Sequence, residues 1–133
     1  MEMIQYKNGK DLTAEHLSQV FQNSGIKRPY QDLERLQKMI DNSDIIISAW
    51  NNDRLVGVAR AITDYSYCCY LSDLAVDREY QQLGIGKHLV ELLREMLGVE
   101  VSLVLLSAPT AVDFYPKIGF ANSDKCYIIA RER

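Results

Sequence analysis

LSDLAVDREYQQLGIGKHLVELL, residues 71–93, changes character twice along its length. Its first part continues a run of aromatic and aliphatic residues that begins at Tyr67, which predicts a strand over 67–76. A polar loop with two glycines follows, and the leucines after it repeat at helical spacing up to Gly98. A strand that runs through a glycine-bearing loop into a helix favours anion binding, because the first helical amides lack intrahelical partners and the dipole is positive there.

Two common phosphate-binding motifs are excluded by single residues of this loop. A Walker A loop would need glycine at position 81 and serine or threonine at position 88, where the chain has Gln81 and His88. A dinucleotide fingerprint would need a third glycine at position 89, which is Leu89. The pattern that remains is Gln81-x-x-Gly84-x-Gly86. By itself a Gly-x-Gly before a helix is more often a tight loop than a cofactor site.

A second motif further along the chain supports a functional interpretation of this pattern. Gln81-x-x-Gly84-x-Gly86 resembles the Gln/Arg-x-x-Gly-x-Gly/Ala signature of the GNAT superfamily of acyl-CoA-dependent N-acetyltransferases, and residues 111–120, AVDFYPKIGF, resemble its A-x-x-F-Y-x-K-x-G-F element. The resemblance covers nearly the whole chain. It implies one N-acetyltransferase domain over 1–133 with an α/β (α+β) fold. That fold is a mixed, mostly antiparallel twisted sheet with helices on both faces and a splayed central strand pair.

The resemblance also implies a cofactor site and a reaction. Backbone N–H groups of the loop would hold the pyrophosphate of acetyl-CoA, and unpaired backbone groups of the preceding strand would hold its pantetheine arm. The residues so assigned are Leu74, Val76, Gln81, Gln82, Gly84, Gly86 and Lys87. The implied reaction is direct attack of a primary amine of a small molecule on the acetyl thioester in a ternary complex. The alternatives are an acetyltransferase acting on a protein amine and a catalytically silent CoA-binding or regulatory module.

Two side chains are candidates for the proton transfers of this reaction. Tyr115, which matches the family's Phe-Tyr element, is the candidate general acid, because a phenol of pKa about 10 can protonate a thiolate of pKa about 8.5 only slightly uphill. The alternative is that it only orients the thioester. Asp73 is the candidate base, acting through water, and the alternative is a structural carboxylate bonded to a neighbouring amide. Regular alternation places Tyr67 and Asp73 on one face of the strand and Tyr70 and Ser72 on the other.

The rest of the chain predicts the elements around this centre. Thr13 and Gly25 mark the ends of a first helix, and a second helix follows Pro29. In the resembling family the acceptor groove includes the loop between these helices, here residues 23–33 with Lys27, Arg28, Tyr30 and Asp32. Strands are expected over 3–6, 44–50, 55–62 and 101–106, the last buried on both faces, with a short helix over 109–115 and final strands from 120 and over 126–130.

Composition limits the partners. The 133 residues suit one domain, and the 15 basic and 18 acidic residues give a net charge of −3 without a basic run, so neither nucleic acid nor membrane is expected as a partner. No metal is expected, because the three cysteines form no Cys-x-x-Cys and the two histidines lack ligand spacing. The beginning of the chain does not resemble a secretory signal, which predicts a cytoplasmic protein. GNAT proteins frequently dimerise, and the sequence neither supports nor excludes a homodimer.

Overall fold

Five strands form one sheet in the order in which they follow along the chain. The structure, a computed structural model, describes residues 3–133. The strands are β1 (Gln5–Asn8), β2 (Ile45–Asn51), β3 (Arg54–Thr63), β4 (Cys68–Val76) and β5 (Ser102–Val104). The first four pair antiparallel, and β5 pairs parallel with β4. The sheet is therefore mixed and mostly antiparallel, as expected.

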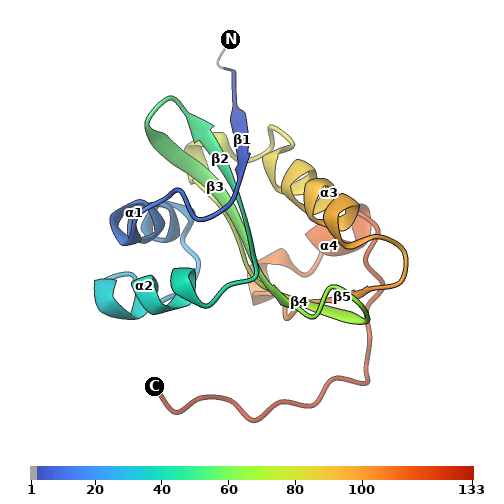
Figure 1. Ribbon diagram of the computed structural model, residues 1–133. Helices are drawn as coiled ribbons and strands as arrows, with labels where there is room; N and C mark the ends of the chain where they lie inside the picture. The colour runs from blue at the N-terminus through green and yellow to red at the C-terminus, as the bar shows by residue number, and fades with distance from the viewer. Residues whose placement is uncertain (1–2) are drawn as a thin grey trace.

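Helices cover both faces of this sheet (Figure 1). α1 (Ala14–Ser24) and α2 (Leu33–Asp41) pack on one face and α3 (Ile85–Leu97) on the other, which produces two hydrophobic clusters with the sheet between them. Three short helices complete the fold: η1 (Arg78–Tyr80), η2 (Pro109–Ala111) and α4 (Phe114–Lys117). The predicted fold class is confirmed. Within residues 3–133, no helix is long and apolar enough to cross a membrane.

Local capping fixes the first two helices and the loop between them. The Thr13 hydroxyl accepts from the His16 amide at 3.0 Å, and the His16 ring accepts from the Thr13 amide at 3.1 Å. Gly25 ends α1 with a φ of 82°, so both predicted boundaries are confirmed. The second helix begins later than expected, because Asp32 caps it by accepting from the Arg35 amide at 3.0 Å. Residues 25–32 therefore connect the two helices.

A bulge in β4 overturns the predicted alternation of its side chains. Arg60 pairs with Asp73 but Ala61 pairs with Leu71, so Ser72 is an extra residue on β4. Directly paired residues share a face, and Asp73 therefore lies on the same face as Tyr70 rather than opposite it. The expected grouping of Asp73 with Tyr67 was wrong. A bulge depends on how two strands pair, and the sequence of one strand does not reveal it.

β4 and β5 separate just before this bulge. The pairing of β4 with β5 covers Cys68 to Tyr70 and ends at the Tyr70–Val104 pair. The remainder of β4, through Val76, continues to pair with β3, but no strand within residues 3–133 pairs with its other side. The predicted splay is thus present, and it lies at the end of β4 that leads through the loop into α3.

The C-terminal strands differ from the expectation. β5 is shorter than residues 101–106, and Val104 and Leu106 are 50% and 44% exposed, so the strand is not buried on both faces. β5 is an edge strand, and only the face with Val101, Leu103 and Leu105 packs against the α3 cluster. Residues 121–133 contain no strand and extend away from the sheet (Figure 1). Strand propensity alone does not produce a strand without a neighbour to pair with.

Candidate active site

The N-terminus of α3 presents backbone donors that no side chain caps. The first intrahelical hydrogen bond runs from the His88 amide to the Gly84 carbonyl at 3.0 Å, so the three amides of residues 85–87 precede it. The first turn contains no acidic residue. The loop before it is tightly curved, with φ of 68° at Gln82 and 84° at Gly84. This helix end can accept an anion through its amides and its dipole.

Glycine is favoured at positions 84 and 86 of the loop for different structural reasons. A Cβ at Gly84 would meet no atom within 4 Å, so its positive φ is what favours glycine there and the space beside it is open. A Cβ at Gly86 would lie 3.3 Å from the ring of Phe114 and 3.7 Å from Val76. Gly86 therefore allows α4 to pack closely on the loop. That packing brings the second motif of the sequence beside the first.

A network that the sequence analysis missed anchors the start of the loop. The Asp77 carboxylate is buried, accepts from the Glu79 amide at 3.0 Å and binds the Arg54 guanidinium at 2.7 Å. The Asn51 side-chain amide donates to the Tyr80 hydroxyl at 2.7 Å. The β2–β3 hairpin thus holds η1 in place. The long sequence separation of these partners explains why no local pattern indicated them.

Two of the predicted loop side chains have partners within the protein. The Gln81 side-chain amide donates to the Val76 carbonyl at 3.0 Å, which ties the loop back to β4. The Lys87 ammonium is exposed and lies 4.0 Å from the Glu91 carboxylate, one turn along the helix. Both residues remain able to use their backbone amides, which is how the family resemblance assigns them.

The backbone of β4 faces the splay at the predicted residues. The Asp77 amide donates to the Val56 carbonyl at 2.8 Å, so the backbone polar groups of Asp77 point toward β3. Because these groups alternate in direction along a strand, those of Leu74 and Val76 point away from β3 and into the splay, where β5 no longer pairs with β4. Apart from the Val76 carbonyl, which accepts from Gln81, these backbone groups are available to a ligand.

Tyr115 lies on α4, half-buried between two aromatic rings. The ring centroids of Phe114 and Phe120 are 5.2 and 5.5 Å from its own, both edge-on. Burial raises the pKa of the Tyr115 phenol, and the nearby charge of Arg28 partly opposes this by lowering it. The phenol is therefore protonated at neutral pH. Among residues 3–133 its hydroxyl has no hydrogen-bond partner, so it is free to donate to a ligand.

Asp73 is fully buried between two arginines. Its Oδ1 binds Arg28 Nε and its Oδ2 binds Arg60 Nε, each at 2.5 Å. Arg60 also donates to the hydroxyls of Ser72 (2.9 Å) and Ser43 (3.3 Å). Both carboxylate oxygens are thus occupied and closed to solvent. Of the two interpretations left open by the sequence, this environment favours the structural one, with guanidinium groups rather than an amide as partners.

The structure brings most of the predicted site residues together around the splay. Arg28 entered the sequence analysis only as one residue of the acceptor loop, and Arg60 did not enter it at all. Arg60 interrupts the apolar run of β3, and a charge within a buried strand needs a partner. This lone charge in an apolar strand was the feature of the sequence that could have revealed the ion pair. Within residues 3–133, no group of three or more metal-ligating side chains occurs.

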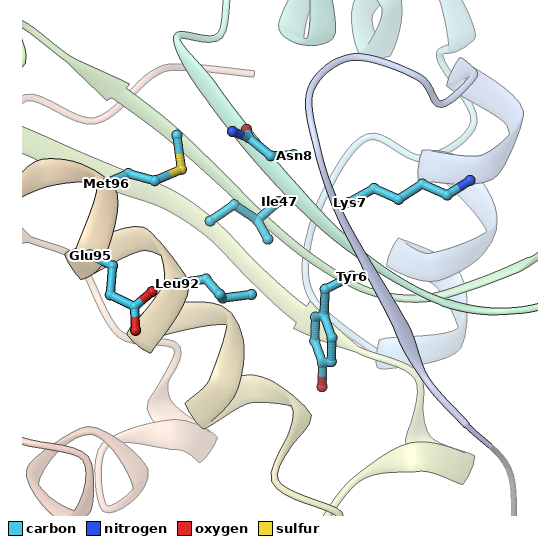
Figure 2. Close-up of a pocket in the computed structure, with 7 residues that line it drawn as sticks. All are labelled: Tyr6, Lys7, Asn8, Ile47, Leu92, Glu95 and Met96. Atoms are coloured by element: carbon cyan, nitrogen blue, oxygen red, sulfur yellow. The ribbon is translucent and has the colours of Figure 1, made fainter.

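A separate cavity lies on the other side of α3 from this site. It measures about 340 Å³ between β1 and the C-terminal half of α3 (Figure 2). Its lining residues are Tyr6, Lys7, Asn8, Ile47, Leu92, Glu95 and Met96. None of them belongs to the loop, the splay or α4. The cavity is therefore separate from the helix end and from the splay.

Comparison with known proteins agrees with the motifs and the fold. The family described as "Acetyltransferase (GNAT) domain" matches residues 10–128. The N-acetyltransferase ycf52 of Pyropia yezoensis is 33% identical over 124 residues, which cover 88% of this chain and 70% of that protein. A protein named histone acetyltransferase TAP1 from Glycine max is 30% identical over 133 residues, covering 90% of this chain and 57% of its own.

Solved structures share the same architecture. A probable acetyltransferase from methicillin-resistant Staphylococcus aureus superposes with a TM-score of 0.82 at 23% identity and covers 96% of this chain and 100% of its own. An aminoglycoside N-acetyltransferase in complex with CoA superposes with a TM-score of 0.75 at 13% identity, covering 100% and 97%. At these identities the likeness concerns the fold alone.

Proposed function

Because this chain belongs to the GNAT acetyltransferases, we propose that it transfers the acetyl group of acetyl-CoA to a primary amine of a small molecule. Acetyl transfer is the activity of the family. The small-molecule acceptor and direct attack in a ternary complex are the proposal. The uncapped N-terminus of α3, beside the part of β4 that no longer pairs with β5, is the observation that carries it.

The residues at this point fit acetyl-CoA. The amides of residues 85–87 and the open space beside Gly84 suit the pyrophosphate. The backbone groups of Leu74 and Val76 that face the splay suit the amides of the pantetheine arm. When bound, acetyl-CoA supplies the activated acetyl thioester.

Tyr115 is the general acid of the proposed reaction. In the transfer the amine nitrogen forms a bond to the acetyl carbon, the bond from that carbon to sulfur breaks, and the phenol gives its proton to the departing thiolate. Burial keeps the phenol protonated, and its hydroxyl has no competing partner among the described residues. The proton lost by the amine passes to water, because Asp73 is closed to the site.

A small acceptor is favoured over a protein lysine by the loop between α1 and α2. Arg28 holds this loop against β4, which favours an acceptor that fits beside a fixed loop. The aminoglycoside enzyme with the same fold is named for a small-molecule acceptor, while TAP1 is named for histones. A histone-tail peptide is therefore the competing acceptor to assay.

Release of CoA thiol from acetyl-CoA, measured with a panel of primary amines, tests the proposal. We expect thiol release that depends on both a small amine and enzyme, with Tyr115→Phe lowering kcat by about a hundredfold and leaving acetyl-CoA affinity unchanged. Tyr127→Phe is the matched control, because Tyr127 is 96% exposed in the C-terminal segment. Full turnover by Tyr115→Phe would exclude its role as acid. Turnover of the peptide but not of small amines would exclude the acceptor class.

A further inference from the structure

Arg28 extends from the loop between α1 and α2 to the bulge of β4. Its Nε binds Asp73, its Nη2 donates to the Ser72 carbonyl at 2.8 Å, and its Nη1 donates to the Lys27 carbonyl at 2.6 Å. A guanidinium has five N–H donors, so one N–H on each terminal nitrogen has no acceptor among residues 3–133. The side chain is 23% exposed. Arg28 is therefore held rigidly and still presents donors to the site.

The cluster around Asp73 carries an excess positive charge. Arg28 and Arg60 contribute two positive charges and Asp73 one negative charge, which leaves a net charge of plus one. No other carboxylate of residues 3–133 lies within 4.0 Å of either guanidinium. Arg60 is almost completely buried, so water compensates this charge poorly. An anionic group of a ligand at Arg28 would compensate it.

This charge lies beside the reacting groups. Ser72, whose carbonyl Arg28 binds, is the bulge residue two positions after Tyr70, the last residue of β4 that pairs with β5. The positive charge of Arg28 also acts on the Tyr115 phenol, where it partly offsets the rise in pKa that burial causes. A positive charge here favours the neutral form of a bound amine, which is the nucleophile.

An exposed apolar row continues the same face of the sheet. Ile62 pairs with Tyr70 on one side, and Tyr70 pairs with Val104 on the other. These side chains are 48%, 38% and 50% exposed, respectively, although they stand on the interior strands β3 and β4 and on β5. The bulge places them on the same face of the sheet as Asp73, the carboxylate that binds Arg28. Their exposure leaves this row open to a ligand.

We propose that the acceptor is an amine that carries a carboxylate next to an apolar group, as in an apolar α-amino acid. Arg28 binds the carboxylate through its remaining N–H groups, and the row Ile62–Tyr70–Val104 packs against the apolar group. Asp73 is a positioning residue, because it binds Arg28 and does not touch the acceptor, and Arg60 binds the other oxygen of Asp73. This inference rests on the proposed function, since it names the substrate class of the same site.

Matched amines with and without the carboxylate test this inference. Leucine and phenylalanine are compared with isoamylamine and phenethylamine, which are the same molecules without the carboxylate. We expect kcat/KM for the amino acids to exceed that for the amines by about tenfold or more, because charge-assisted hydrogen bonds are strong. Arg28→Gln should reduce this preference by at least about tenfold. Comparing ratios between proteins cancels the different basicity of the amines.

Lys38→Gln is the matched control for Arg28→Gln. It removes the same charge from the last turn of α2, where the Lys38 side chain is exposed and forms no ion pair within residues 3–133. The preference should survive in Lys38→Gln. Acetyl-CoA affinity and thermal unfolding verify that both variants are folded.

A measurement on the unaltered protein keeps the test decisive if Arg28→Gln does not fold. Isocaproate, which is leucine without its amine, should inhibit competitively with leucine, and the uncharged isocaproamide should not. Equal inhibition by both compounds would overturn the inference.

The remaining outcomes separate this inference from the proposed function. An unchanged preference in Arg28→Gln would overturn the inference alone. Turnover of spermidine or a histone peptide, but not of leucine or phenylalanine, would also overturn it while acetyl transfer stands. Absence of thiol release with every primary amine would overturn the proposed function, and the inference with it.

Discussion

At the scale of single residues, the carboxylate of Asp73 is the clearest point at which structure changes the chemical interpretation. Its two oxygens are bound by Arg28 and Arg60, and it has no exposed surface. A general base needs access to the proton that it removes. Asp73 has no such access. Its carboxylate instead links β4 to β3 through Arg60 and to the loop between α1 and α2 through Arg28.

Replacement of Asp73 by asparagine separates the structural role from the catalytic one. We expect Asp73→Asn to lower the free energy of unfolding by about 3 kcal/mol, because it leaves the buried Arg60 charge without a counter-charge. Urea unfolding measures this loss. Asp11→Asn is the control, because Asp11 is exposed. Unchanged stability combined with a large loss of kcat would instead assign Asp73 as the base.

At the scale of elements, the turn between β3 and β4 depends on one carboxylate. Asp64 Oδ1 accepts from the amides of Tyr67 (2.8 Å), Ser66 (2.9 Å) and Cys68 (3.1 Å). These backbone hydrogen bonds, led by the one from Tyr67, lower the pKa of Asp64 from 3.8 to about 2. The turn therefore favours the charged carboxylate.

This lowered pKa predicts an acid-dependent stability difference. Because the folded pKa lies below the unfolded one, the stabilisation is present above about pH 4 and is lost as the pH falls through about 2. We expect the protein to be more stable than Asp64→Asn at neutral pH, and we expect this difference to shrink as the pH falls from about 4 to about 2, as measured by urea midpoints. Asp53→Asn, in the β2–β3 turn, is the control. A difference that persists unchanged at low pH would contradict this account.

The N-terminus of α3 gives a second prediction at this scale. Gly84→Ala should weaken acetyl-CoA binding by about tenfold or more, because a Cβ occupies the space assigned to the pyrophosphate. Gly98→Ala is a matched control at the other end of α3, where the φ is 80° and the space is also open. Both variants should lose stability, since alanine is strained at positive φ. Equal affinity loss in both would remove the loop assignment.

The elements that the sequence predicted well are those with local signals. Thr13 and Gly25 bound α1, and α3 ends at Gly98, because capping requires particular residues at particular positions. The bulge at Ser72 and the length of β5 depend on pairing between strands. No local pattern encodes these features, and the predicted faces of β4 and the burial of residues 101–106 were wrong for that reason.

At the scale of the whole molecule, the helices on the two faces of the sheet contribute different parts of the proposed site. α3 and α4 lie on one side of the sheet with the loop, where we propose that the cofactor binds, and α1, α2 and their loop lie on the side that we propose for the acceptor (Figure 1). The motifs predicted the first side, because they are contiguous in sequence. The second side depends on Arg28, Arg60 and Asp73, which are separated by up to 45 residues and meet only in the folded chain.

Calorimetric titration with acetyl-CoA, with ATP as a parallel control, tests the central claim most directly. The account predicts micromolar affinity for acetyl-CoA and no binding of ATP, because the loop lacks the Walker A pattern and the splay suits a pantetheine arm. Binding of ATP without acetyl-CoA, or of neither, would contradict the account and return Tyr115 to a packing role.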